Sequence, residues 1–228
     1  LHVPAEGAAV VLRALRAAGA VDAGYRAMDS LSADKGYRHW HADLSNAETP
    51  FEANLGLTVH ARLAKRRDAN FLGGPALLAL LDDDAVYARK RLVCLTACPE
   101  ESGSPSEEEG IPFHPEPPTK SPPLHGTETI WRDDVCLGFV RSTAFSHTLR
   151  RTVLYGYVHA KHPFGPSGDD DHGDDDHISS KSNIHIADDD WLKKGTWSVG
   201  DRGSRHPATL HLQAPFDPTN LKIKSIKY

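Results

Sequence analysis

Six consecutive residues, Gly36 to His41, combine two aromatic rings with three side chains that can carry positive charge, and Asp34 precedes them closely. Tyr37 and Trp40 offer flat apolar faces for a planar ligand. A carboxylate such as Asp34 can accept from two neighbouring N–H donors, because both of its oxygens accept at once. This pattern favours a binding site for a planar heterocycle. The alternative is that Tyr37 and Trp40 pack at a domain interface and that Asp34 is solvated.

Other reactive side chains form no recognisable catalytic or metal site. The cysteines are odd in number (Cys94, Cys98 and Cys136), so a complete disulfide framework is not expected. No second Cys or His pair stands at zinc-finger spacing, and no G-x-S-x-G motif marks a nucleophilic serine. The run DDDHGDDDH at 169–177 offers ligands for a divalent ion, but its composition is typical of a solvated loop. We therefore expect no catalytic residue and no metal site in this chain.

Composition excludes several classes of partner. The formal net charge is −5 and the pI is about 6.3, which argues against a surface that neutralises nucleic-acid phosphates. No apolar stretch approaches the roughly 18 residues that a membrane-spanning helix needs. No G-x-G-x-x-G motif lies between a strand and a helix, so a dinucleotide-binding fold is not expected within the chain.

The first third of the chain predicts helices and one strand. Residues 8–18 are good helix formers with apolar residues at helical spacing, and Gly19 should end that helix. A second helix is expected over 25–36, between Gly24 and Gly36, and a third over 75–81, where Pro75 suits a first turn. Alternation of Leu55, Leu57 and Val59 predicts a strand over 53–61.

The remainder predicts β-structure interrupted by two insertions. A strand over 90–96 is followed by a Pro-, Ser- and Glu-rich stretch at 100–123, which is typical of a linker. A hairpin is expected over 127–140, with its turn at Asp133–Asp134. Further strands are predicted over 152–158, 183–186, 196–199 and 208–212, and a second insertion over 165–177. The fold class is therefore α+β, with an all-β second part.

The run from Ser30 to Val59, SLSADKGYRHWHADLSNAETPFEANLGLTV, resembles the aminomethyltransferase family, whose folate-binding domain carries the form LEKGYRHW…TPxEAGLGxTV. Within that family the likeness is to the sarcosine dehydrogenases, mitochondrial flavoproteins that oxidatively demethylate N-methylglycine. Matching segments run from end to end of the chain: Leu1–Pro4, Tyr25–Leu31, Phe71–Gly73, Arg91–Leu95 and Pro215–Asn220.

The resemblance implies a fold and a division into two parts. Residues 1–87 are expected to be the C-terminal part of the folate-binding domain, a partial ferredoxin-like α/β layer. Residues 88–228 are expected to be the small C-terminal β-barrel, with the two insertions near 100–123 and 165–177. Because the likeness begins within the folate-binding domain, we expect the chain to be a C-terminal piece of a longer protein.

The resemblance also implies a ligand and its site. Tetrahydrofolate would bind near Tyr25, Arg26, Asp34, Tyr37 and Trp40. Asp34 stands where the family has Glu, one methylene longer. The function implied is the folate-binding region of a sarcosine dehydrogenase-like protein of the mitochondrial matrix, which passes a one-carbon unit to tetrahydrofolate.

FAD would be bound outside this chain, by an upstream domain or a separate subunit, and the chain alone is expected to be inactive. The alternative is a non-catalytic regulatory or structural subunit in a larger assembly, related to the regulatory subunit of pyruvate dehydrogenase phosphatase. An upstream sequence with degraded flavin contacts would favour that alternative.

Overall fold

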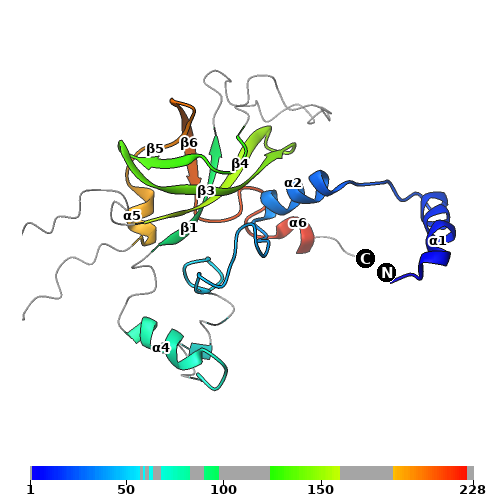
Figure 1. Ribbon diagram of the computed structural model, residues 1–228, viewed down its shortest axis with the longest axis horizontal. Coiled ribbons are helices and arrows are strands. Elements are labelled where there is room, and N and C mark those ends of the chain that lie inside the picture. The colour runs from blue at the N-terminus through cyan, green and yellow to red at the C-terminus, as the bar shows by residue number, and fades with distance from the viewer. Residues whose placement is uncertain are drawn as a thin grey trace, which may run out of the picture.

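The computed structural model describes residues 2–56, 59, 62–63, 68–82, 90–97, 124–159 and 187–224. Its centre is a closed antiparallel barrel in the spatial order β1–β4–β3–β2–β5–β6 (Figure 1). The strands are β1 (Arg91–Ala97), β2 (Thr129–Arg132), β3 (Val135–Ser146), β4 (Arg151–Val158), β5 (Trp197–Asp201) and β6 (Ser204–His211). The α+β class with a C-terminal barrel is thereby confirmed.

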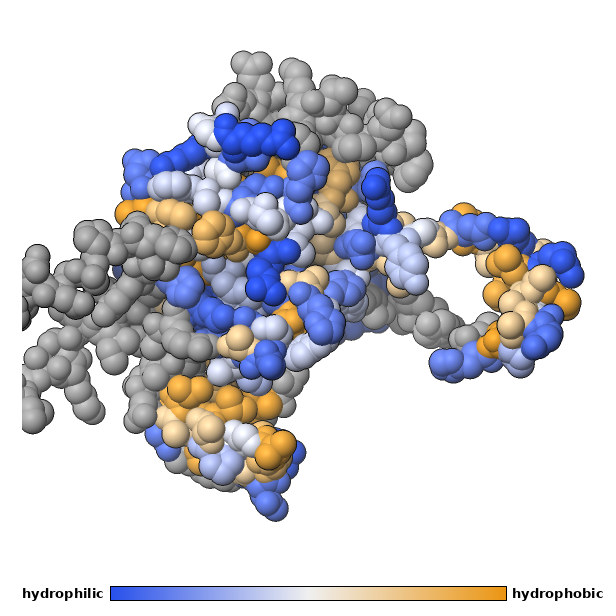
Figure 2. Space-filling view, viewed as in Figure 1, coloured by the Kyte–Doolittle hydropathy of each residue, from blue (hydrophilic) through white to orange (hydrophobic). Residues whose placement is uncertain are grey.

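Helices flank the barrel at several points. They are α1 (Ala5–Ala17), α2 (Tyr25–Lys35), α4 (Gly74–Asp82), α5 (Asp189–Lys193) and α6 (Leu221–Lys224). Helix α2 packs on β3 and β4, whereas α1 stands apart from the barrel (Figure 1) and buries none of its residues. Apolar side chains gather over α1 and over α4 (Figure 2). No helix in the described part of the chain is long and apolar enough to cross a membrane.

Strands β1 and β4 are buried on both faces, which explains their nearly continuous apolar sequences. Val93, Leu95 and Leu154 point into the barrel core. The alternate residues form a second cluster on the outer face, where Cys94 and Tyr155 pack with Ala33 of α2. This second cluster joins the helical part of the chain to the barrel.

Several local predictions are confirmed. Gly19 and Gly36 follow helices α1 and α2 with φ of 93° and 70°, the left-handed conformation expected after a helix end. The hairpin of β2 and β3 turns at Asp133 and Asp134, both with positive φ, which fits the twist of a tight hairpin. The helix predicted from residue 8 begins earlier, at Ala5.

The strand predicted over 53–61 is wrong. Residues 51–54 form a turn and Val59 is helical. Thr49 and Glu52 explain the difference, because they form a reciprocal capping box. The Glu52 carboxylate accepts from the Thr49 N–H at 2.8 Å, and the Thr49 hydroxyl accepts from the Glu52 N–H at 3.2 Å. The alternation of Leu55, Leu57 and Val59 suggests a strand, but the capping box that precedes it favours the start of a helical turn.

Two polar contacts join the helical part to the barrel and its C-terminal tail. Lys35, in the last turn of α2, donates to Asp217 and Asn220. Lys90 donates to the buried carboxylate of Glu48 at 2.7 Å. The predicted insertions at 100–123 and 165–177, the strand at 183–186 and Cys98 all lie outside the described residues.

Candidate functional site

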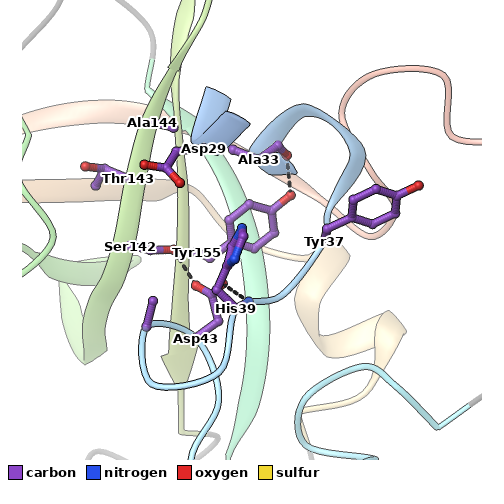
Figure 3. A pocket seen from close by; sticks show the side chains of 10 residues that line it. Asp29, Ala33, Tyr37, His39, Asp43, Ser142, Thr143, Ala144 and Tyr155 are labelled. Carbon is purple, nitrogen blue, oxygen red and sulfur yellow. Dashed lines mark hydrogen bonds between the residues drawn. The ribbon is translucent and has the colours of Figure 1, made fainter. Parts of the chain in front are cut away.

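A pocket of about 310 Å³ opens between α2, the loop of residues 37–43 and the outer face of β3 and β4 (Figure 3). Its walls come from two parts of the chain that are distant in sequence: α2 with the loop that follows it, and β3 with β4. The lining residues are Asp29, Ala33, Tyr37, His39, Ala42, Asp43, Ser142, Thr143, Ala144 and Tyr155. This volume is near the lower end of the range for ligand pockets, roughly 300–1,000 Å³.

Tyr155 forms the aromatic wall of the pocket. It alternates along β4 with residues of the barrel core and so points outward, toward α2. Its hydroxyl donates to the Ala33 carbonyl at 2.7 Å. Burial raises the pKa of Tyr155 far above its usual value, so the hydroxyl remains a donor at physiological pH. The ring is thereby fixed in place beneath α2.

Asp43 organises the loop that forms the second wall. Its carboxylate accepts from the His39 N–H at 2.8 Å and from the Ser142 hydroxyl. Tyr157 donates to the Asp43 carbonyl at 3.1 Å. Each carboxylate oxygen of Asp43 therefore accepts one hydrogen bond, and these bonds hold the loop in position against β3.

A bulge in β3 aims side chains at this loop. The register between β3 and β4 shifts between Val140 and Ser142, so Arg141 is the additional residue. Arg141 donates to the Ala42 carbonyl at 3.2 Å, while Ser142 bonds Asp43. Two successive residues of the bulge, Arg141 and Ser142, therefore bind the loop to the barrel.

The structure brings only Tyr37 of the predicted residues to the pocket lining. Tyr25 is 84% exposed at the start of α2, and Arg26 beside it is also exposed. Trp40 is 58% exposed and meets the ring of His41 edge-on. These three residues do not line the pocket.

Asp34 does not line the pocket and is only 2% exposed. Burial raises its pKa, against hydrogen bonds from the Ser146 and Thr148 side chains that lower it. Its carbonyl accepts from the Phe216 N–H at 3.1 Å. Oδ1 of Asp34 has no hydrogen-bond partner among the described residues. The Asp34 side chain is not among the lining residues.

Several lining residues were missed by reasoning from sequence. Asp29 precedes Ala33 by four positions in α2, so the two share a helix face, and that spacing was a usable signal. The sequence pattern places Tyr155 on an alternating strand, but it does not show which part of the chain the Tyr155 side chain contacts. The contributions of Ser142, Thr143 and Ala144 depend on strand register and on a bulge, and neither has a recognisable local sequence pattern here.

Cysteine chemistry finds no support at this site. Cys94 is buried in β1 beside Tyr155, and burial raises its pKa to about 12. A thiol with that pKa is not deprotonated near neutral pH and is a poor nucleophile. Cys136 is half-buried in β3.

Removal of the Tyr155 hydroxyl should weaken the attachment of α2 to the barrel. In Tyr155→Phe the Ala33 carbonyl loses the donor from the barrel and keeps only the Gly36 N–H at 3.2 Å, so we expect a loss of about 1 kcal/mol in the free energy of unfolding. Denaturant titration measures this loss. Tyr25→Phe is the matched control, because Tyr25 is exposed; equal stability losses in the two variants would contradict the assignment.

Comparison with known proteins agrees with this architecture. The GCVT N-terminal domain matches residues 1–62, and the glycine cleavage T-protein C-terminal barrel domain matches residues 111–217. Aminomethyltransferase T of the glycine cleavage system from Bartonella henselae has the same fold. Its TM-score is 0.52 at 18% identity, over 84% of this chain and 38% of that one.

Curated relatives extend the likeness over nearly the whole chain. Mitochondrial sarcosine dehydrogenase from Mus musculus is 36% identical over 99% of this chain and 20% of its own length. The mitochondrial pyruvate dehydrogenase phosphatase regulatory subunit from Mus musculus is 25% identical over 93% of this chain and 20% of its own length. The chain therefore spans about a fifth of the length of these relatives. The chain belongs to the aminomethyltransferase family of glycine cleavage T-protein domains, in a form similar to the corresponding region of sarcosine dehydrogenase.

Proposed function

We propose that this chain binds tetrahydrofolate through its pterin ring in the pocket between α2 and the barrel. The observation that carries the proposal is an aromatic wall, Tyr155, facing an acidic residue, Asp29, across a pocket of about 310 Å³. A pocket of that size suits a two-ring pterin, and the remainder of a folate would extend into solvent. Family membership supports the same ligand.

The lining residues fit the chemistry of a pterin. The ring is flat and partly apolar, which suits the face of Tyr155. Its amino and ring N–H groups need acceptors, and its carbonyl and ring nitrogens need donors. Asp29 offers acceptor oxygens, and Thr143 and His39 add polar groups on other sides. No charged group has to be buried without a partner.

The role of these residues in such a site is orientation. Bound tetrahydrofolate would supply the amines that accept a one-carbon unit at the oxidation level of formaldehyde. The protein would fix the ring by stacking on Tyr155 and by hydrogen bonds at its edge, which removes translational and rotational freedom before transfer. The engaged carboxylate of Asp43 keeps the loop wall in position.

The protein to which this region corresponds would be a sarcosine dehydrogenase-like enzyme. In that enzyme FAD, bound outside this chain, would oxidise the N-methyl group of sarcosine, and this region would direct the released carbon to folate. The two curated relatives from Mus musculus are mitochondrial proteins, and we place this chain in the mitochondrial matrix on that basis.

Calorimetry with 5-formyltetrahydrofolate, a chemically stable reduced folate, tests the proposal. We expect micromolar binding to the wild-type chain and at least tenfold weaker binding by Ala42→Trp. Ala42 is exposed and lines the pocket, so a Trp side chain there would fill the space without disturbing the core. Ala76→Trp, on exposed α4, is the matched control and should bind normally.

Two results would overturn the proposal. Binding that is insensitive to Ala42→Trp would place the folate elsewhere. Absence of binding by the wild-type chain would remove the folate function and would favour the non-catalytic regulatory alternative.

A further inference from the structure

We propose that a groove beside the Tyr155 pocket binds an aromatic carboxylate through Phe139 and Arg141, and that in folate this group is p-aminobenzoylglutamate. This inference rests on the proposed folate function and deepens it. The groove has a volume of about 440 Å³, and its lining includes His41, Ala42, Gly126, Thr127, Phe139 and Arg141. Ala42 also lines the Tyr155 pocket, so the two hollows adjoin.

The two hollows differ in the charge of their lining residues. The Tyr155 pocket has two carboxylates in its lining, Asp29 and Asp43. The lining of the groove in the described part of the chain contains no carboxylate, and it includes the guanidinium of Arg141 and the imidazole of His41. A ligand that spans both hollows should therefore present N–H donors at one end and a carboxylate at the other.

Arg141 is oriented before any ligand arrives. It is the additional residue of the β3 bulge and is exposed, and its Nε donates to the Ala42 carbonyl at 3.2 Å. That bond restrains the plane of the guanidinium and leaves its two terminal amino groups to a ligand. Among the described residues, no carboxylate forms an ion pair with Arg141. A guanidinium binds a carboxylate through two parallel N–H donors, and prior orientation lowers the entropy lost on binding.

Phe139 supplies an aromatic surface on the same side of β3. Val140 points into the barrel core, so Phe139 and Arg141 on either side of it both face outward. The Phe139 side chain is 45% exposed although it is large and apolar. A benzoyl ring that packs on Phe139 would cover this surface and bring its attached carboxylates toward Arg141.

The wall that contains Gly126 is held by a buried carboxylate. Glu128 is 6% exposed and accepts from the backbone N–H groups of His125, Gly126 and Thr127. Burial alone would raise the pKa of Glu128, but these N–H bonds outweigh burial and lower it. Gly126 has a φ of 95°, and a Cβ atom there would lie 3.3 Å from the Arg141 carbonyl oxygen. The wall therefore lies close against the strand that carries Arg141.

The opposite wall contains a residue in an uncommon backbone conformation. His41 has a φ of 73°, in the left-handed region that residues other than Gly seldom adopt. Its N–H donates to the Leu44 carbonyl at 2.8 Å, which maintains the turn. Residues held in this way are concentrated at binding sites. The conformation of His41 thus agrees with a ligand site at the groove.

The chemistry of the groove indicates which part of a folate it would hold. Beyond the pterin, a folate consists of an aminobenzoyl ring followed by a glutamate with two carboxylates. The ring matches Phe139, and a carboxylate matches the guanidinium of Arg141. An inorganic anion would use Arg141 alone. The tail of the ligand, and not only its ring system, should therefore contribute to affinity.

Two ligands and three variants test the assignment by calorimetry. The probes are 5-formyltetrahydrofolate and 5-formyl-6-methyltetrahydropterin, which has the same ring system without p-aminobenzoylglutamate. We expect Arg141→Met to weaken binding of the first about tenfold and to leave binding of the second nearly unchanged. Arg141→Lys keeps the charge without the two parallel donors and should fall between. Arg202→Met is the matched control, because Arg202 is exposed on the barrel and does not line the groove.

The outcomes separate this inference from the function on which it rests. If the wild-type chain binds neither ligand, the folate function is wrong and this inference fails with it. Equal affinity of the wild-type chain for the two ligands would leave the pterin site in place and overturn the role of the groove. If Arg141→Met weakens both ligands equally, Arg141 acts only by holding the loop at Ala42, and the inference is again overturned. An equal effect of Arg202→Met would reduce the result to general charge and contradict the assignment. Unfolding curves of each variant check that the fold is unchanged.

Discussion

Gly138→Ala should lose about 3 kcal/mol or more of the free energy of unfolding, a large share of the stability of a small domain. Gly138 lies in β3 and pairs with Val158 of β4. A Cβ atom at this position would overlap the Tyr157 carbonyl oxygen and would lie 3.3 Å from the Val158 Cα. Both contacts are to backbone, so relief requires the two strands to separate.

Denaturant titration followed by tryptophan fluorescence measures this effect. Gly7→Ala in α1 is the matched control, because its Cβ would meet only the Val3 side chain at 3.5 Å, an ordinary contact. Ala also favours a helix over Gly, so this variant should lose nothing. If Gly138→Ala were as stable as Gly7→Ala, the close approach of β3 and β4 at this point would be wrong.

Lys90→Met should lower the free energy of unfolding by about 2–3 kcal/mol. Lys90 joins the loop of residues 45–48 to the barrel. Its ammonium bonds Glu48 at 2.7 Å and lies 4.9 Å from the centre of the Tyr157 ring. The side chain of Glu48 is only 4% exposed, so removal of Lys90 leaves a carboxylate in a dry position without its cation. Lys193→Met is the control, since its pair with Asp190 is largely exposed and should contribute little.

The same pair makes stability depend on pH. Burial alone would raise the pKa of Glu48, but hydrogen bonds from Lys90 and Ser45 outweigh burial and lower the pKa to about 2. The folded-state pKa is therefore below the unfolded value of about 4.5. Linkage then requires the stabilisation to be complete above pH 4.5 and to disappear as pH falls toward 2.

Unfolding curves between pH 6 and pH 2 measure this dependence (roughly the window in which carboxylates of this kind titrate). Lys90→Met should show a smaller loss of stability over that window, because its Glu48 no longer has the lysine partner. An identical pH dependence in the two proteins would show that Lys90 does not determine the pKa of Glu48.

The sequence alone determined most of the local structure. The ends of α1 and α2 followed from Gly19 and Gly36, since few other residues adopt positive φ at low cost. The turn of the β2–β3 hairpin followed from the Asp133–Asp134 pair, and the barrel strands followed from apolar runs and alternation. Helix ends, tight turns and strands depend on residues that are close together in the chain, so a short stretch of sequence is enough to predict them. The strand predicted at 53–61 is wrong for an equally local reason, because the capping box at Thr49 and Glu52 competes with the alternation of Leu55, Leu57 and Val59.

Only the tertiary structure decided which side chains form the pocket. Tyr155 meets Ala33 across 122 positions of sequence, and Ser142 meets Asp43 across 99. Those meetings depend on strand register and on the bulge at Arg141, which change which face a residue occupies without changing local propensity. Asp34 and Asp29 also show that burial cannot be predicted from the sequence of one helix. They are carboxylates of one helix, and only the packing of α2 on the barrel buries the first and leaves the second open to the pocket.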